Sequence, residues 1–203
     1  MLRSLTQVTI RTANRILDLS NPVVMGVINV TSDSYYVTSR YGDNIPAIIE
    51  SVGKMLKEGA SIIDIGGMSS RPGAVAISEA EEKAKILPVI EMLNNHFPGI
   101  VLSVDTYRAR IAEKAIQSGA SIINDISGGG MDSGMIDVIA KHKVPYVLMH
   151  MKGTPATMQQ MTQYDDFIGD IMEYFVGKLR ALKQSGVNDI ILDPGFGFAK
   201  TME

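Results

Sequence analysis

Polar side chains end six short apolar segments of the sequence, and their types suit the recognition of a small polar ligand. They are Asn29, Asp64, Asp105, Asn124, Asp125, His150 and Asp193. A carboxylate accepts hydrogen bonds and an amide both donates and accepts, so Asp105, Asn124 and Asp193 suit a flat heterocycle with amine donors and a carbonyl acceptor. A single aspartate at such a place is more often a helix cap or turn former, so it is the convergence of several that favours a ligand site.

Two segments that follow apolar runs could bind an anion or close over a ligand. The segment DIGGMSSRPGA (64–74) combines two glycines, two serines and Arg71. Free backbone amides, hydroxyls and a guanidinium make an anion cradle, although an ordinary flexible loop explains the composition equally well. Residues 30–43 form a longer connection than the usual 2–6 residues or so, which favours a lid.

Other motifs carry weaker signals. His150 alone at a strand end is more often structural than catalytic, and GFGFAK (195–200) lacks the spacing of either common nucleotide-binding loop. We expect Glu79, Glu81 and Glu82 to be the solvated first turn of a helix, where acids favour the helix dipole.

The elements that must position these residues alternate along the chain. The six apolar runs are continuous, as in strands buried on both faces of a parallel sheet, and lie at 23–29, 61–67, 100–105, 121–125, 145–150 and 189–193. Helical patterns lie between most of them, including a stripe from Tyr164 through Ile168 to Leu182 and a capping box at Ser78. GASII occurs at 59–63 and again at 119–123, each time after a helical pattern, which indicates a βα repeat.

Two architectures fit this alternation, an open doubly wound sheet and a TIM (β/α)8 barrel. Both place function at the carboxyl ends of the strands. No segment resembles a linker, so we expect one domain over residues 1–203, in which residues 1–20 form a hairpin (8–10 with 16–19) that covers one end of the sheet.

Composition excludes several classes of protein. The net charge of −3 gives no electrostatic footprint for nucleic acid or an anionic membrane, and 45% hydrophobic residues argue against a disordered chain. The sequence has no cysteine, so it has no disulfide, zinc–thiolate site or cysteine nucleophile. No apolar run approaches the roughly 20 residues of a membrane span, and charges interrupt the first 20 residues, so we expect a cytoplasmic location.

Taken together, the motifs resemble the dihydropteroate synthase family of the folate pathway. The resemblance rests on GVINVTSDS, DIGGMSSRPGA, SVDTYRARIAEKAI, INDISGG, LMHMKGTPATMQ and DPGFGFAKT, which occur in the family's order and spacing from about residue 20 to 203. It implies a TIM (β/α)8 barrel, of which six strands are countable here. The implied reaction joins 6-hydroxymethyl-7,8-dihydropterin diphosphate to 4-aminobenzoate and releases 7,8-dihydropteroate and diphosphate.

The resemblance also implies roles for individual residues. Asn29 would help to hold Mg²⁺ with the diphosphate, and Ser70 and Arg71 would lie near that diphosphate. Asp105, Asn124 and Asp193 would bind the pterin. Met149 would lie in the pocket floor, and Gly197 and Phe198 would border the aminobenzoate. Asp105, Asp193 and Arg71 would carry the catalysis.

The sequence departs from the family pattern in three places. Ser32 replaces a proline in the first loop, Ser70 replaces a threonine, and the family's later motifs, Ser-Arg-Lys-Ser and Arg-x-His, do not occur. We therefore expect residues 1–203 to be part of a longer chain, a homodimer when complete. Two alternatives remain open: a pterin-binding methyl-transfer domain of a corrinoid system, and a non-catalytic barrel kept for binding.

Overall fold

A computed structural model describes residues 8–12, 15–31, 44–68 and 76–201. Six parallel strands form one sheet, in which each strand pairs with the next in sequence. These strands are β3 (Val24–Asn29), β4 (Ala60–Gly66), β5 (Leu102–Asp105), β6 (Ile122–Asp125), β7 (Tyr146–Met149) and β8 (Ile190–Asp193). A doubly wound sheet reverses its strand order at a switch point. Because the strands here follow one another in sequence order without a reversal, the sheet has the barrel architecture and not the doubly wound one.

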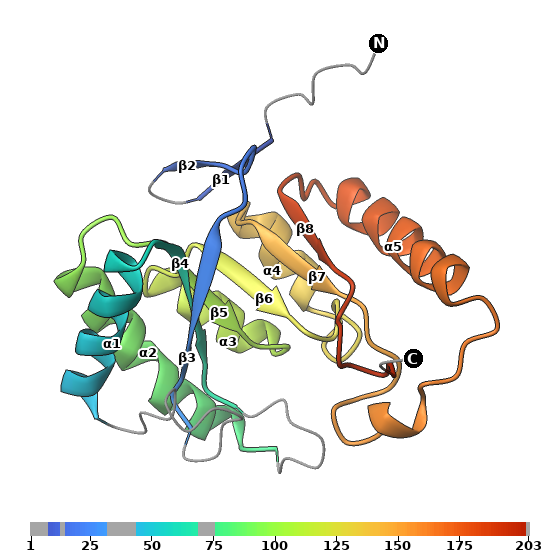
Figure 1. Ribbon diagram of the computed structural model, residues 1–203, viewed down its shortest axis with the longest axis horizontal. Helices are drawn as coiled ribbons and strands as arrows, with labels where there is room; N and C mark the ends of the chain where they lie inside the picture. Colours follow the sequence, from blue (N-terminus) through green and yellow to red (C-terminus); the bar gives the residue numbers. More distant parts are fainter. Residues whose placement is uncertain (1–7, 13–14, 32–43, 69–75, 202–203) are drawn as a thin grey trace.

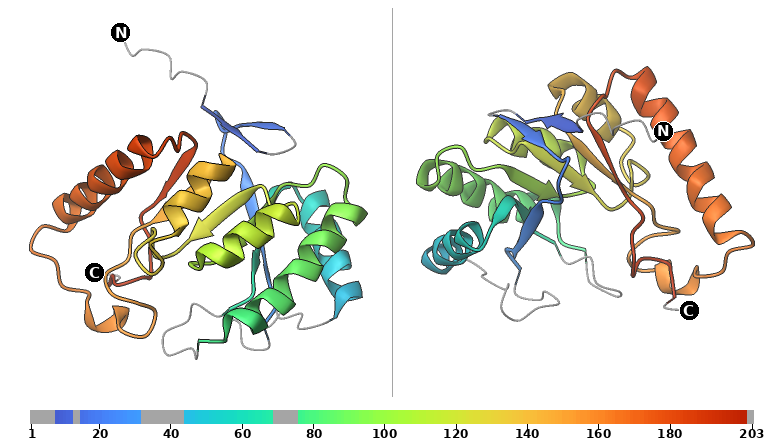
Figure 2. Two further views of the ribbon diagram at one scale, coloured as in Figure 1. Left: turned by 180° about the vertical axis from the view of Figure 1, so that it is seen from behind. Right: turned by 45° about the horizontal axis from the view of Figure 1, so that its top comes forward.

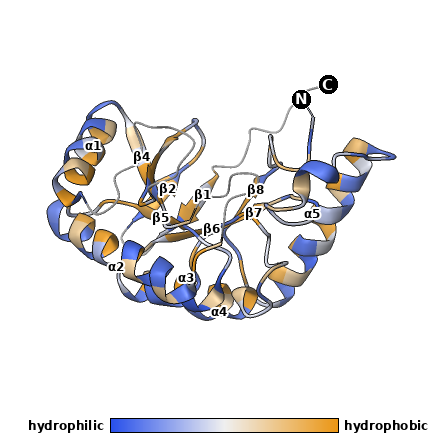
Figure 3. Ribbon diagram, turned by 90° about the horizontal axis from the view of Figure 1, so that it is seen from below, coloured by the Kyte–Doolittle hydropathy of each residue, from blue (hydrophilic) through white to orange (hydrophobic). Residues whose placement is uncertain are grey.

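Helices connect the strands and cover one face of the sheet. They are α1 (Ile45–Lys57), α2 (Glu79–His96), α3 (Ala109–Gln117), α4 (Met135–His142) and α5 (Phe167–Gln184), with the short 3₁₀ helix η2 (Met158–Gln160) before α5. The helices form an outer arc around the strands (Figure 3), with the carboxyl ends of the strands on the same side as η2 and the C-terminus (Figure 1). The fold is thus an arc of a (β/α)8 barrel. Within the described ranges, every helix is too short or too polar to span a bilayer.

Local sequence signals account for the helix starts. The side chain of Ser78 accepts a hydrogen bond from the Glu81 N–H at the start of α2, which confirms this part of the expected capping box, and Asn44 caps α1 in the same way. The helical stripe from Tyr164 is partly wrong, because Asp166 caps α5 and Tyr164 precedes the helix. Ile168 is also 67% exposed, so it does not belong to the buried face.

Alternation along the strands divides the core into two layers. The outer layer packs against the helices and contains Ile63, Leu102 and Leu148. The inner layer contains Ile62, Val101, Ile122 and Val147. Successive strand side chains point to opposite faces, so every second residue continues the inner layer towards the carboxyl ends.

The expected N-terminal hairpin is confirmed. β1 (Thr9–Arg11) pairs antiparallel with β2 (Ile16–Asp18), and Figures 1 and 2 place the pair at the amino ends of the strands. Ile10 and Leu17 are buried in the inner layer of the core. The hairpin therefore closes the inner layer at the end of the sheet opposite the strand-end polar residues.

The expectation that Glu82 is solvated is wrong. Glu82 is fully buried, where it accepts hydrogen bonds from Thr106 Oγ1 at 2.7 Å and from the Arg108 guanidinium. Arg108 also donates to the Ile77 carbonyl at 2.6 Å. The spacing contained the signal, because position 82 lies on the buried face of α2 with Ile86, Val89, Ile90 and Leu93.

Candidate functional site

One row of inward-facing residues crosses the carboxyl ends of four neighbouring strands. Asn29 of β3 is in register with Gly66 of β4, Gly66 with Asp105 of β5, and Asp105 with Asn124 of β6. All four residues occupy strand positions that face the inner layer, because every second residue of a strand points to the same face. The fold therefore brings together Asn29, Asp105 and Asn124, which were predicted from sequence. We call this inward-facing edge at the carboxyl ends of the strands the rim.

Gly66 makes room for two side chains of this row. A Cβ atom added there would lie 3.0 Å from Asn29 Oδ1 and 3.7 Å from Asp105 Oδ2. Both oxygen atoms therefore lie over the bare backbone of Gly66. Sequence analysis did not assign Gly66, although a glycine at the carboxyl end of a buried strand signals a close approach.

Asp105 lies in a negative, poorly solvated environment. Burial raises its pKa well above the usual range, and the nearby carboxylates of Asp64, Asp125 and Glu82 raise it further. A ligand that presents N–H donors or positive charge favours the ionised form instead. Asp105 is therefore suited to bind a donor-rich or cationic group.

Within the described ranges, the side chain of Asn124 has a hydrogen-bond partner on one side. Its Nδ2 donates to Asp64 Oδ2 at 3.1 Å. Asp64 is an inward-facing residue of β4 that lies one layer below Gly66 and is 5% exposed. The side chain of Asn124 thus faces the rim while a buried carboxylate holds it from below.

Asp125, which follows Asn124, points to the opposite face and does not join the site. Its carboxylate accepts four hydrogen bonds, from Ser127 N, Ser127 Oγ, Gly129 N and the Tyr146 hydroxyl, at 2.7–2.8 Å. These bonds fix the turn after β6. The structure therefore separates two adjacent polar residues into one that faces the rim and one that structures the turn.

Asp193 ends β8 in register with Met149 of β7, two strands beyond Asn124. Its Oδ1 accepts the Gly195 N–H at 2.7 Å, which shapes the start of the segment 195–200. Gly195 has a φ of 67° and a Cβ there would lie 2.3 Å from the His150 carbonyl oxygen, so only glycine fits. Met149 is 2% exposed and packs against this turn.

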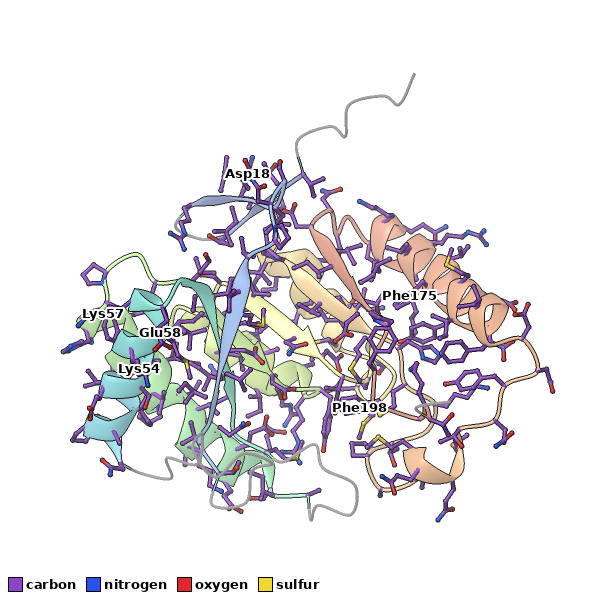
Figure 4. The ribbon with its side chains drawn as sticks, viewed as in Figure 1. Asp18, Lys54, Lys57, Glu58, Phe175 and Phe198 are labelled. Carbon is purple, nitrogen blue, oxygen red and sulfur yellow. The ribbon has the colours of Figure 1, made fainter. Side chains whose placement is uncertain are left out.

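Gly197 and Phe198 lie in that same segment, at the carboxyl-end side of the sheet. Figure 4 labels Phe198 there, apart from Phe175, which lies between α5 and the sheet. The structure thus places both residues next to the rim that carries Asp193. Their contact with an aminobenzoate stays a prediction.

Lys200 and His150 hold the segment 195–200 in place. Lys200 Nζ donates to His150 Nδ1 at 2.9 Å, and to the carbonyls of His150 and Phe198 at 3.2 and 3.0 Å. Burial, together with the nearby charges of Lys200 and Lys152, lowers the pKa of His150 to about 4. A neutral imidazole can accept from the ammonium group. His150 therefore has the structural role that its isolated position suggested, and Lys200 is a contributor that sequence analysis missed.

Ser70, Arg71 and most of the expected lid, residues 32–43, lie outside the described residues. Their proposed contacts with a diphosphate remain predictions. The described strand ends on either side of them, Asn29 and Gly66, are adjacent in the sheet, so both segments leave the same part of the rim.

Comparison with known proteins identifies the family. The model of the pterin binding enzyme family matches residues 25–203. This chain belongs to the pterin-binding enzyme family. The match includes β4 to β8 and all of β3 after its first residue, and thus every described residue of the rim.

Similar proteins within the pterin-binding family are dihydropteroate synthases. The enzyme of Synechocystis sp. is 43% identical over 182 residues, which cover 89% of this chain and 62% of that protein. The Bacillus subtilis enzyme is 42% identical over 88% of this chain and 60% of its own length. The chain therefore spans less than two thirds of the length of these curated relatives.

Solved structures agree with the sequence comparison. The Yersinia pestis dihydropteroate synthase, solved as a sulfonamide drug complex, superposes with a TM-score of 0.89 at 39% identity and covers 96% of this chain and 70% of that one. The Burkholderia cenocepacia enzyme, complexed with 7,8-dihydropteroate, gives a TM-score of 0.82 at 32% identity over 98% of this chain and 67% of that one. The strand arc is therefore the arrangement found in these enzymes.

Proposed function

We propose that the protein is a dihydropteroate synthase, in which the described rim binds a dihydropterin diphosphate and the product is 7,8-dihydropteroate. The observation that carries this proposal is the convergence of Asp105, Asn124 and Asp193 on one inner rim. The related chains named as dihydropteroate synthases favour this reaction over corrinoid methyl transfer.

The polar groups of the rim complement a pterin ring. The 2-amino group and ring N–H groups of a pterin are donors, and the two carboxylates accept from them. Asn124 can accept and donate at a mixed edge. A buried, correctly placed set of acceptors discriminates strongly against ligands that lack the donors, because the acceptors would then stay unpaired.

The same carboxylates favour the reaction's transition state. When the C–O bond to diphosphate breaks, positive charge develops on the pterin methylene and spreads into the ring. Asp105 and Asp193 stabilise that charge more than they stabilise the neutral substrate, which is differential binding of the transition state. The aminobenzoate amine then forms the new C–N bond, loses its proton, and mainly needs correct positioning.

Oxygen atoms at the rim fit a divalent cation. Asn29 Oδ1 and Asp105 Oδ2 both lie over the backbone of Gly66, and Mg²⁺ prefers oxygen ligands, with few protein groups besides waters and phosphates. The described residues contain no cluster of three or more histidines, aspartates or glutamates suited to a metal. Asn29 would hold Mg²⁺ together with the substrate's diphosphate, whose charge the ion would neutralise as it leaves.

The assay that tests the function is release of diphosphate from the dihydropterin diphosphate in the presence of 4-aminobenzoate. Formation of 7,8-dihydropteroate in equal amount is the expected result. Binding of the pterin without turnover would instead favour the non-catalytic alternative. Turnover with a methyl-tetrahydrofolate and a corrinoid protein would favour the methyl-transfer alternative.

Ligand order gives a first prediction. If Asn29, Ser70 and Arg71 hold Mg²⁺ and diphosphate, then 4-aminobenzoate should bind only after those groups occupy the rim. Titration calorimetry of the complete protein with 4-aminobenzoate, with and without Mg²⁺ and diphosphate, measures this. Equal affinity under both conditions would count against the assigned roles.

A second prediction concerns Gly66→Ala. The added methyl group must displace Asn29 Oδ1, which would lie only 3.0 Å away. We expect Mg²⁺-dependent binding of diphosphate to weaken about fivefold, or about 1 kcal/mol, measured by calorimetry. Gly177→Ala on α5 is the control, because its Cβ meets nothing within 4 Å. An unchanged Mg²⁺ dependence in Gly66→Ala would remove Asn29 from the proposed metal site.

Three expectations remain proposals of the same kind: a single domain over residues 1–203, a homodimer and a cytoplasmic location. The inner core layer that links the hairpin to the strands supports the first of them. The absence of cysteine is compatible with a reducing compartment and so supports the third.

A further inference from the structure

Asp64 is a buried carboxylate in a layer that barrels usually fill with aliphatic side chains. It is 5% exposed and lies in register with Val27 on one side and Ser103 on the other. Burial raises the pKa of Asp64, while the side chains of Ser103 and Asn124 partly offset this effect. The sequence resemblance assigned no role to it.

The hydrogen bonding of Asp64 is incomplete, unlike that of an aspartate that serves only the fold. Oδ2 accepts from Asn124 Nδ2 at 3.1 Å, whereas Oδ1 has no hydrogen-bond partner in the described part of the chain. Asp125, also buried, accepts four hydrogen bonds. A buried acceptor without a partner destabilises a fold, so stability alone does not explain Asp64.

The residue that donates to Asp64 Oδ2, Asn124, belongs to the rim. A carboxylate can only accept, so an ionised Asp64 requires that Asn124 presents its NH₂ group downwards. The carbonyl Oδ1, at the other end of the planar amide, is then free for a ligand. Without Asp64, the amide could rotate by 180° and present a donor in place of an acceptor.

We propose that Asp64 is a positioning residue, which fixes the side-chain amide of Asn124 so that its Oδ1 accepts a hydrogen bond from an N–H group of the bound pterin. The proposal rests on the proposed function, since it assumes a pterin at the rim. Asp64 acts through Asn124 and does not itself take part in the chemistry.

The test uses two variants of Asp64 in the complete protein, with 6-hydroxymethylpterin as an unreactive probe. Asp64→Asn can present either an oxygen or an NH₂ group to Asn124, so it no longer fixes the orientation of that amide. Asp64→Leu keeps the branching of the side chain at Cγ, removes every hydrogen-bonding atom, and also removes the cost of burying a charge. We expect the affinity for the probe to fall about tenfold in Asp64→Leu, with an unchanged melting temperature, and to fall by less in Asp64→Asn.

A double-mutant cycle separates positioning from direct contact. In an Asn124→Ala background, either change at Asp64 should alter the probe affinity less than about twofold, because the residue through which Asp64 acts is gone. An equal loss in both backgrounds would overturn the proposal. Asp132→Asn is the control for a structural carboxylate, since Asp132 accepts from the Ala109 and Gly134 amides, and it should lower the melting temperature without lowering the affinity.

The outcomes also separate this inference from the proposed function. Absence of probe binding in the wild-type protein would overturn the pterin site and this inference with it. Binding by the wild type and equally by Asp64→Leu would overturn only the role of Asp64. A lowered affinity in Asp64→Leu, with melting temperature retained, would support it, because a purely structural residue would show the reverse pattern.

Discussion

Replacement of Arg108 by Met is expected to lower the free energy of unfolding by about 3–5 kcal/mol, the typical cost of leaving one partner of a buried ion pair uncompensated. Glu82, its partner, has no exposed side-chain surface, and Arg108 keeps 17% of its own. After the substitution, the Thr106 hydroxyl would be the remaining donor to the Glu82 carboxylate among the described residues. Urea denaturation at neutral pH measures the effect.

The control for Arg108→Met is Lys85→Met on the same helix α2. Lys85 pairs with Glu81 at 2.9 Å, but both side chains are partly exposed, at 26% and 50%. A pair of this kind contributes about 0.3–0.5 kcal/mol. The double change Glu82→Leu with Arg108→Met should recover much of the lost stability. A loss in Arg108→Met no larger than that in the control would contradict the buried pair.

Asp193→Asn is expected to weaken pterin binding at least about tenfold while the melting temperature changes little. In the wild type, Asp193 Oδ1 accepts the Gly195 N–H at 2.7 Å. The oxygen of the new asparagine must keep this bond, which fixes the orientation of its amide group. The amide nitrogen then replaces Oδ2 and faces the N–H donors of the pterin. Losing a charged hydrogen bond costs about 1.5–3 kcal/mol, or a factor of ten or more.

Calorimetry with 6-hydroxymethylpterin provides the measurement for Asp193→Asn. Asp189→Asn is the control, because Asp189 immediately precedes the opposite end of the same strand, β8. Its affinity for the pterin should equal that of the wild type. If Asp193→Asn also binds with wild-type affinity, the carboxylate of Asp193 serves only the turn at Gly195.

The arrangement of the rim followed from local sequence patterns to a large degree. Continuous apolar runs that alternate with helical stripes indicate parallel strands, and parallel strands bring their carboxyl ends to one edge. Strand-end position alone therefore predicted that Asn29, Asp105 and Asp193 share an edge of the sheet. The hairpin of residues 8–10 and 16–19 was predictable in the same way, from two short apolar segments.

The local sequence pattern does not show which of two adjacent polar residues belongs to the rim. Asn124 and Asp125 end the same strand, and composition does not distinguish them. Asn124 belongs to the rim because its position in the strand faces the inner side of the sheet. Asp125 faces the other side, where four donors from the turn and from Tyr146 bind its carboxylate. These donors meet only after β6, its turn and β7 have packed together.

Local signals were enough to predict the succession of strands and helices, the capping of α2 at Ser78, and the set of polar residues at the strand ends, because each depends on neighbours a few residues away. Three features depended on tertiary packing instead: the burial of Glu82, the space that Gly66 opens between Asn29 and Asp105, and the support of Asn124 by Asp64 from below. Asp64 and Asn124 are 60 residues apart along the chain. Their contact depends on strand register and side-chain parity across three strands, and no local pattern encodes that combination.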